Sequence, residues 1–335
     1  MGIMFGNALH FLLFMLLFSP VAFSGRCHPQ DKKVLLQIKK DFNSPYLLAS
    51  WDPKTACCDW YCVECDPKTH RITSLIISSS IPDTNLSGPI PPSVGDLPYL
   101  EYLDFHKLPK LTGPIQPAIA KLTKLKSLSI TWTNVSGPIP DFLAQLKNLD
   151  SLYLSFNNLS GHIPASLSRL PNLLSLNLDR NKLTGPIPAS FGFFKKPGPN
   201  LFLSHNQLSG PIPSSLGQLD PERIDFSRNK LTGDASLLFA HNKKTQLLDL
   251  SRNLLSFDLS KVEFPKSLTW LDLNHNKIHG SIPVGLSAVQ NLQQFNVSYN
   301  LLSGKIPQGG ELGKFDKFSY FHNKNLCGTP LPNCK

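Results

Sequence analysis

Apolar and polar positions alternate in short stretches that recur along the chain at a nearly constant spacing. Leu152 and Leu176 stand 24 residues apart, and so do Asn157 and Asn181. Each stretch has the period of a half-buried strand, and it is followed by Asn, an apolar residue, Ser or Thr, Gly and usually Ile-Pro. The first apolar anchors are Leu103, Leu128, Leu152, Leu176, Leu201, Ile224, Leu248, Leu271 and Phe295, after an irregular opening copy around Leu75. The pattern predicts ten units across residues 72–308.

A single unit of this kind cannot bury its apolar face, but stacked units share one continuous core. We therefore predict an α/β repeat solenoid, a curved stack of ten ~24-residue units with a parallel concave β-sheet. The Asn that ends each strand is expected to satisfy backbone groups of its own coil and the next one. The Gly and Pro columns are expected to form the bends of the scaffold. Two units depart from the pattern, at Gly233-Asp234-Ala235-Ser236 and at Ser256-Phe257-Asp258.

The two ends of the chain differ in composition from the repeats. Residues 1–24 are apolar and uncharged and end in a small-x-small triplet, which predicts a cleaved secretory signal, although the usual basic start is missing. No later run is long and apolar enough to predict a membrane anchor. Residues 25–71 and 309–335 are predicted to cap the stack. In the first cap, Asp31 is expected to cap a helix that buries Val34, Leu35 and Ile38.

The seven cysteines fall into two groups, one at each end of the chain. In a secreted chain this arrangement predicts terminal caps stapled by disulfides, and the odd count leaves one thiol unpaired. The Cys62-x-x-Cys65 spacing resembles half a zinc site. No second pair of ligands follows at the required spacing, so we predict no metal site. The cysteines are Cys27, Cys57, Cys58, Cys62, Cys65, Cys327 and Cys334.

Strand alternation predicts which side chains face solvent on the concave wall: the residue before the first anchor, the one between the anchors and the one after the second. The middle row is Asp104, Ser129, Tyr153, Asn177, Phe202, Asp225, Asp249, Asp272 and Asn296, and the row before it contributes Tyr102, Arg223 and Trp270. One step beyond the strand lies a row that is entirely basic or aromatic. We call this row the rim: Lys107, Trp132, Phe156, Arg180, His205, Arg228, Arg252, His275 and Tyr299.

Exposed aromatic and arginine side chains that have no core to fill are candidate binding anchors. Alternation alone would turn the rim inward, but the chain is already leaving the strand there. We therefore predict that the rim, together with Tyr102, Asp104, Tyr153, Phe202, Arg223, Asp225, Asp249, Trp270 and Asp272, forms a partner-binding surface. Scattered aromatics are also common on surfaces that bind nothing.

The row Asp225, Asp249 and Asp272 raises the alternative of a glycosidase, because neighbouring parallel strands would hold the carboxylates roughly 5 Å apart. Catalysis requires one carboxyl that stays protonated in a sheltered cleft. The predicted wall is open, and the nearby arginines are expected to keep these acids ionised. We therefore predict no catalytic residue, no enzyme activity and no cofactor.

The chain carries 33 Lys and Arg against 23 Asp and Glu, a formal net charge of +10. Outside a cell, this charge favours acidic polysaccharides or acidic proteins over nucleic acid as partners. The alternative is a basic surface that only aids solubility.

Several segments, from the first cysteine to the last repeat, are similar to the polygalacturonase-inhibiting proteins of plants, a family of extracellular leucine-rich repeat proteins. These segments are CHPQDKKVLLQIKKDF, CCDWYCVECD, GPIQPAIAKL, TWTNVSGPIP, LSHNQLSGPIP, SRNKLTGDAS, DLSRNLLSFDLSKVEFP, DLNHNKIHGSIP and NVSYNLLSGKIPQGG. The resemblance implies secretion to the plant cell wall, or apoplast. It also implies binding of fungal endopolygalacturonases through the concave face, which limits pectin breakdown in plant defence.

The resemblance also implies particular covalent features. It pairs Cys27 with Cys57, Cys58 with Cys65 and Cys327 with Cys334, and leaves Cys62 unpaired. The family usually has one more C-terminal bridge, but this chain carries Ser303 and Asn325 at the two positions concerned. Triplets typical of N-glycosylation begin at Asn85, Asn134, Asn158 and Asn296.

Two other functions stay open for a chain of this type. Some plant antifreeze proteins resemble the same lineage, so ice binding is one alternative, although the rows above are irregular and charged. The other is a soluble signalling ectodomain that binds a peptide or a receptor. An assay of pectin breakdown with and without the protein would separate these functions from inhibition.

Overall fold

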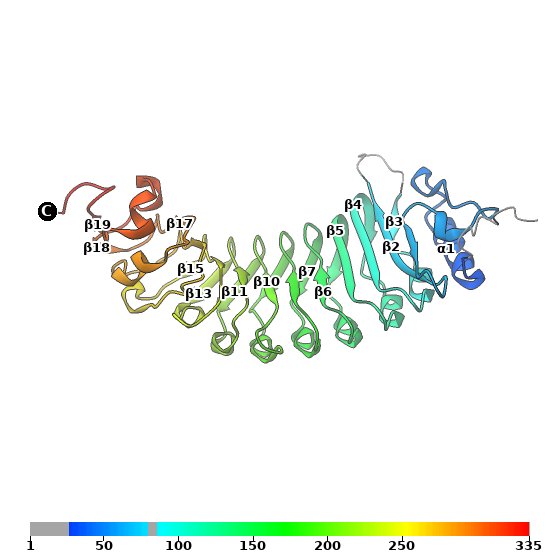
Figure 1. The fold of residues 1–335 in the computed structure, drawn as a ribbon, viewed down its shortest axis with the longest axis horizontal. Helices are drawn as coiled ribbons and strands as arrows, with labels where there is room; N and C mark the ends of the chain where they lie inside the picture. Colours follow the sequence, from blue (N-terminus) through cyan, green and yellow to red (C-terminus); the bar gives the residue numbers. More distant parts are fainter. Residues whose placement is uncertain (1–26, 80–85, 335) are drawn as a thin grey trace, which may run out of the picture.

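The computed structural model describes residues 27–79 and 86–334, which form a single curved stack of coils. Figure 1 shows an arc with helix α1 (Pro29–Asp41) at one end, strand β19 (Asn325–Cys327) at the other and short helical turns along its outer edge. The predicted signal at residues 1–24 and the triplet at Asn85 lie outside the described residues. No helix in the described ranges is long and apolar enough to cross a membrane.

A sheet that is parallel except at its first strand lines one side of the stack. Its register aligns the predicted anchors, with Leu128 beside Leu152 and Leu152 beside Leu176, and these leucines are buried. Its strands are β1 (Val63–Cys65), antiparallel to β2 (Ile72–Ser78), then β4 (Tyr102–Gly113), β5 (Ser127–Pro138), β6 (Ser151–Tyr153), β8 (Ser175–Asn177), β10 (Asn200–Phe202), β12 (Arg223–Asp225), β14 (Leu247–Asp249), β16 (Trp270–Asp272) and β17 (Gln294–Asn296). This is the predicted concave sheet.

A second set of parallel strands follows the turn of each coil. It consists of β3 (Gly88–Pro89), β7 (Asn158–His162), β9 (Lys182–Gly185), β11 (Gln207–Pro211), β13 (Lys230–Gly233) and β15 (Leu254–Leu255). Strands β4 and β5 each run for 12 residues and pair with neighbours in both sets. The repeat pattern did not predict these two long strands, because the pattern marks only the leucine-bearing half of each.

Each coil returns along the outer edge through a short 3₁₀ helix, in most coils directly after the Ile-Pro pair. The isoleucine points into the core, as at Ile163 and Ile187, and the preceding Gly161 has φ +79°, a conformation that glycine adopts without steric cost. These helices are η3 (Pro92–Asp96), η4 (Pro117–Lys121), η5 (Asp141–Gln145), η6 (Ala165–Arg169), η7 (Ala189–Phe193), η8 (Ser214–Gln218), η9 (Ser236–Leu238), η10 (Leu259–Lys261) and η11 (Val284–Ala288).

The asparagine column is buried or partly buried, and its side chains are hydrogen-bonded to the backbone. Asn181 donates to the carbonyl oxygens of Leu154, Leu178 and Asp179, and its Oδ1 accepts from the backbone nitrogen of Leu159. Leu154 and Leu159 belong to the preceding coil. The prediction of a structural role is confirmed, but the second coil that each asparagine serves is the preceding one rather than the next.

The N-terminal cap closes the first coil. It contains α1, η1 (Tyr46–Leu48) and η2 (Cys57–Asp59), and Trp51 stacks on Trp60 inside it. The prediction that Asp31 caps the helix is wrong. His28 is the capping residue, and Asp31 lies buried in the first turn, where it accepts hydrogen bonds from Arg71 Nε and Nη2 and from the nitrogen of Ile72. Asp31 therefore ties the cap to strand β2.

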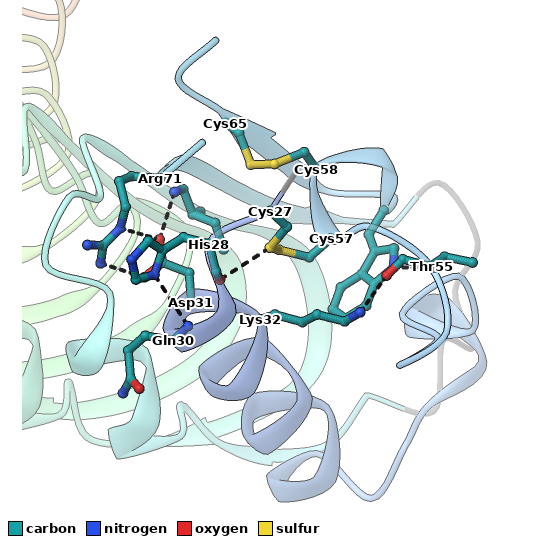
Figure 2. The surroundings of a disulfide bond; sticks show 12 residues. Cys27, His28, Gln30, Asp31, Lys32, Thr55, Cys57, Cys58, Cys65 and Arg71 are labelled. Atoms are coloured by element: carbon teal, nitrogen blue, oxygen red, sulfur yellow. Dashed lines mark hydrogen bonds and ion pairs between the residues drawn. A yellow bond between two sulfur atoms is a disulfide. The ribbon is translucent and has the colours of Figure 1, made fainter. Parts of the chain in front are cut away.

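The disulfides of the structure lie in the two caps. Cys27 bonds to Cys57 and Cys58 to Cys65 in the N-terminal cap (Figure 2), and Cys327 bonds to Cys334 at the other end. These are the pairs that the family resemblance implied. Because the sulfurs of Cys27, Cys57 and Cys58 are consumed in these bonds, their proximity, within 4.8 Å of one another, does not make a metal site.

The C-terminal cap continues the repeat geometry for one more turn. Its strand β19 runs parallel to β18 (Ser303–Lys305) of the last repeat, with η12 (Gly310–Lys314) and η13 (Lys317–Ser319) between them. Asn323 accepts from the nitrogen of Leu302 and donates to the carbonyls of Val297 and Tyr320. It therefore extends the asparagine column into the cap.

Candidate protein-binding surface

Every residue of the rim has a left-handed backbone. The φ angles of the nine rim residues lie between +52° and +56°. This conformation breaks the strand alternation that would have turned the side chains inward, and it places them along one edge of the concave sheet. A non-glycine residue pays about 1–2 kcal/mol for it, and from Phe156 to Tyr299 each rim residue is followed by an asparagine of the hydrogen-bonded column. The left-handed backbone therefore explains why the side chains of the rim do not turn inward.

The first part of the rim is a stack of flat side chains. The rings of Trp132 and Phe156 lie 3.6 Å apart and nearly parallel, and the Arg180 guanidinium lies 5.0 Å from the centre of the Phe156 ring. The three side chains come from successive coils. Because each holds its neighbour in place, little conformational freedom is left to lose when a partner binds.

A second stack occupies the C-terminal part of the rim. Tyr299 lies between His275 and His322, with ring centres 4.1 Å and 4.2 Å away, and Phe321 packs against its edge. His322 also has a positive φ of 56°. Sequence reasoning missed it, although Tyr320-x-His322-Asn323 repeats the spacing of Val297-x-Tyr299-Asn300.

Between the two stacks the rim is basic. Arg228 and Arg252 are exposed, and neither takes part in an ion pair with any described residue within 4.0 Å. Burial, followed by the charges of Arg180 and Arg228, lowers the pKa of His205 below its usual value. The pKa of His275 is lowered by burial and then by Arg252 and Arg228. The histidines therefore add little charge near neutral pH.

The middle row lies half-buried on the floor of the concave face, and it includes Tyr153 and Phe202. Its Asp and Asn side chains have a structural role that the sequence did not reveal. All of them except Asp104 accept a hydrogen bond from the backbone nitrogen two residues later, as Asp225 does from Ser227 at 2.9 Å. The same contact is made by Asn177, Asp249, Asp272 and Asn296. The row therefore also caps the strand ends.

The row after the second anchor does not face solvent as predicted. Most of its members are small hydroxyl residues that are buried beneath the rim: Thr131, Ser155, Ser204, Ser227, Ser251 and Ser298. The left-handed turn one residue later folds the rim side chain over this position. Asp179 belongs to the same row, and its Oδ1 accepts from the nitrogen and hydroxyl of Ser204.

The prediction that neighbouring arginines hold the acids ionised is wrong for Asp249. Burial, followed by the charge of Asp225, raises the pKa of Asp249 to about 7, and the same two causes raise that of Asp179 to about 7. Burial also raises the pKa of Asp272, and the hydrogen bonds from Asn274, followed by the charge of Arg252, oppose this rise. Register pairing makes Asp225 and Asp249 direct neighbours, so the charge of Asp225 adds to the effect of burial at Asp249. Sequence reasoning did not single out Asp179.

The row before the first anchor forms the opposite flank of the face. Tyr102 and Trp270 are 45% and 39% exposed, and Arg223 is exposed in the same row. On the floor next to Tyr102, burial raises the pKa of Asp104, and no described residue donates to its buried Oδ1.

The remaining predicted sites lie apart from the rim or are occupied by internal contacts. Asn134 is exposed on the second strand set, and its Oδ1 accepts from Asn158 Nδ2 at 2.9 Å. Asn296 lies on the concave floor, where its Oδ1 accepts from Ser298. Cys62 is the free cysteine of the described residues, and burial raises its pKa to about 11, which keeps it an unreactive thiol.

Comparison with known proteins identifies the family to which the chain belongs. Residues 28–66 match the model described as "Leucine rich repeat N-terminal domain", and residues 123–183, 200–219 and 267–288 match leucine rich repeat models. A polygalacturonase inhibitor of Pyrus communis is 66% identical over 328 residues, which cover 97% of this chain and 98% of that protein. The chain belongs to the polygalacturonase-inhibitor family. Polygalacturonase inhibitor 2 of Arabidopsis thaliana is 64% identical, covering 98% of both chains.

The chain also resembles a solved structure whose title gives a different property. The crystal structure of a plant ice-binding protein has a TM-score of 0.90 and 52% sequence identity, and the match covers 92% of this chain and 99% of that one. The predicted fold class, a curved leucine-rich-repeat stack with capped ends, is confirmed, and so is the predicted family.

Proposed function

We propose that this protein is a secreted, non-catalytic inhibitor that binds fungal endopolygalacturonases across the rim and floor of its concave face. By doing so it limits pectin degradation in the plant cell wall. The rim supports this proposal most strongly. Nine coils in succession place a basic or aromatic side chain at one edge, and Tyr, Trp and Arg are the residues that most often dominate protein interfaces.

The aspartates on the floor of the concave face do not imply catalysis. Asp225, Asp249 and Asp272 use one oxygen each to cap their own strand ends, which explains their presence without catalysis. The relatives are named inhibitors. We therefore expect the purified protein to release no reducing ends from pectin.

Mixing the purified protein with a panel of fungal endopolygalacturonases tests the proposal. The rate of polygalacturonate depolymerisation should fall for at least one enzyme and should be zero with the protein alone. Depolymerisation by the protein alone, or full activity of every enzyme at saturating protein, would contradict it.

The net charge of +10 supports a second association, with the carboxylates of demethylated pectin. Exposed charges are screened beyond about 8 Å at physiological ionic strength. Retention on immobilised polygalacturonate should therefore weaken as sodium chloride is raised, and soluble polyanions should compete. Retention that is indifferent to salt would count against this mode.

The similarity to an ice-binding protein makes ice binding the second candidate. An ice lattice is regular, so an ice-binding face should repeat one uncharged side chain. The outward row of the second strand set is instead varied and partly charged: Asn134, Asn158, Lys182, Gln207, Lys230, Leu254, Lys277 and Leu301. The structure therefore favours inhibition. Measured ice-crystal shaping without polygalacturonase inhibition would reverse the choice.

A further inference from the structure

The rim continues beyond the last repeat into the C-terminal cap. The nitrogen of Tyr299 donates to the carbonyl of Phe321, and the nitrogen of Asn300 donates to the carbonyl of His322. The corresponding residues of most preceding coils make the same two bonds to the coil that follows them. His322 has φ +56° and is followed by Asn323, so it repeats the backbone of a rim residue. The cap therefore adds one rim position after the nine of the repeats.

This last coil is aromatic where the repeats are small. Phe321 stands where the repeats mostly carry a small hydroxyl residue, such as Ser298. Its ring centre lies 5.8 Å from that of Tyr299 and 5.2 Å from that of Phe318. Phe318 is 56% exposed and Tyr299 is 41% exposed. Tyr299, Phe318, Phe321 and His322 thus form one continuous group of rings, which we call the cap cluster.

The core of the cap does not explain the cap cluster. Tyr320 fills the buried position of this coil and donates its hydroxyl to the carbonyl of Leu312. Phe318 and Phe321 belong neither to the described hydrophobic core nor to the side chains packed against it. The last coil of a solenoid usually presents a polar outer face, because it must stay soluble. Exposed rings that contact one another there indicate an interaction site.

Basic side chains surround the cap cluster. Lys317 Nζ lies 5.5 Å from the centre of the Phe318 ring. Lys317 and Lys324 are exposed, and neither forms an ion pair with a described residue within 4.0 Å. Asp316, the acid of the same segment, accepts from the nitrogen of Phe318. Apolar rings beside positive charge favour a partner that presents apolar and acidic side chains.

We propose that the cap cluster binds the endopolygalacturonase, so that the interface extends from the concave sheet onto the C-terminal cap. This inference rests on the proposed function. The two surfaces are continuous, because Tyr299 belongs to both and His322 stacks on it at 4.2 Å. Figure 1 shows the cap at the end of the arc, next to β17. An enzyme that covers the C-terminal part of the rim therefore also contacts the cap.

Affinity for a susceptible endopolygalacturonase, measured by calorimetry, tests the cap cluster with a matched control. Phe318→Ala/His322→Asn removes two of its rings, and asparagine tolerates the positive φ of His322. Phe193→Ala removes an equally apolar and exposed ring from the outer edge. We expect the double variant to weaken binding about tenfold or more. Phe193→Ala should leave binding within about twofold of the parent.

A charge reversal tests the same contact without removing a ring. Lys317→Glu reverses an exposed charge beside Phe318, and Lys266→Glu reverses an exposed charge near η11 on the outer edge. At low salt, Lys317→Glu should slow association about fivefold, because an acidic partner is then repelled. Lys266→Glu should leave the association rate within about twofold. Added sodium chloride should reduce the difference between the two variants.

The outcomes separate this proposal from the proposed function. If the double variant and Lys317→Glu bind within about twofold of the parent while Arg228→Ala binds more weakly, the cap proposal fails and the inhibitor function stands. If the parent binds no endopolygalacturonase, the proposed function fails, and the partner assigned to the cap cluster fails with it. A double variant that binds weakly and also melts early, together with normal association of Lys317→Glu, shows only a destabilised cap and overturns the proposal.

Discussion

Trp132 and Phe156 stack face to face, with ring centres 3.6 Å apart and an interplanar angle of 14°. Each residue has φ near +55° and precedes the turn of its own coil. The stack is therefore set by the backbone of two neighbouring repeats, and it presents a fixed aromatic edge beside Arg180.

Substitutions at the rim can test the cost of its left-handed backbone separately from the role of its side chains in binding. At Arg228, with φ +52°, glycine removes the steric cost of the left-handed turn, whereas valine adds a β-branch to it. We expect Arg228→Val to lower the free energy of unfolding by about 1–2 kcal/mol and Arg228→Gly to lower it by less. Chemical denaturation of the two variants checks this order. Equal stability of the two would show that the turn is not strained.

Substitution of an asparagine of the column should lower the stability of the protein without changing its binding surface. Asn229 accepts from the nitrogen of Leu208 and donates to the carbonyls of Leu203, Phe226 and Ser227. Asn229→Ala should lower the free energy of unfolding by about 1–3 kcal/mol, because these groups lose their partner. Asn148→Ala, which removes a single exposed hydrogen bond to Thr123, is the control. Equal melting temperatures for both variants would refute the structural role.

The acidic floor predicts that stability depends on pH. Burial and the charge of Asp225 raise the pKa of Asp179 and Asp249 from 3.8 to about 7. Between these values the folded protein binds more protons than the unfolded chain, so the free energy of unfolding falls as pH rises from about 4 to about 7. The melting temperature should be higher at pH 5 than at pH 8.

Substitution of these two carboxyls should remove most of this dependence. Asp179→Asn/Asp249→Asn should be more stable than the parent at pH 8, on the order of 1 kcal/mol per carboxyl. The exposed Asp96→Asn serves as the control. A parent whose melting temperature rises between pH 5 and pH 8, or a double variant with the same slope as the parent, would contradict the account.

The C-terminal cap predicts a stabilising disulfide. Ser303 and Asn325 are register partners of the parallel strands β18 and β19, and neighbouring strands lie roughly 4.8 Å apart, within the Cα range of natural disulfides. Ser303→Cys/Asn325→Cys should therefore form a bridge and raise stability by up to about 3 kcal/mol. Thiol titration and the melting temperature check this, with Ser303→Cys as the control. Three free thiols in the oxidised double variant would show that the strands are not in this register.

Much of the fold follows from the sequence because packing forces it to repeat. Leu152, Leu176 and their equivalents must stack in register to bury one core, so their spacing reveals the coil. The asparagine ending each strand, such as Asn181, is also predictable, since a buried amide at a bend must pair with backbone groups.

Which of the other side chains are exposed depends on the backbone conformation, and the spacing of residues in the sequence does not reveal it. A left-handed residue at Arg180 reverses which side chain is exposed, so the buried hydroxyl of Ser204 and the partly buried carboxyl of Asp179 escaped the alternation rule. His322 was missed because the last coil lacks the leucines that mark a unit. Asp31 looked like a helix cap, but its partner Arg71 is 40 residues away in the sequence.

The central claim is that the concave face binds the enzyme, and paired measurement of affinity and melting temperature tests it most directly. Tyr153→Ala, Phe202→Ala, Arg228→Ala and Arg252→Ala should each weaken binding to a susceptible endopolygalacturonase, by about 2 kcal/mol or thirtyfold at the strongest positions. Their melting temperatures should stay near that of the parent, because none of the four side chains lies in the leucine core. Phe193→Ala and Val284→Ala remove exposed side chains from the outer edge and should leave affinity unchanged. The account would be contradicted if all four concave variants bound within threefold of the parent while the outer-edge variants lost binding.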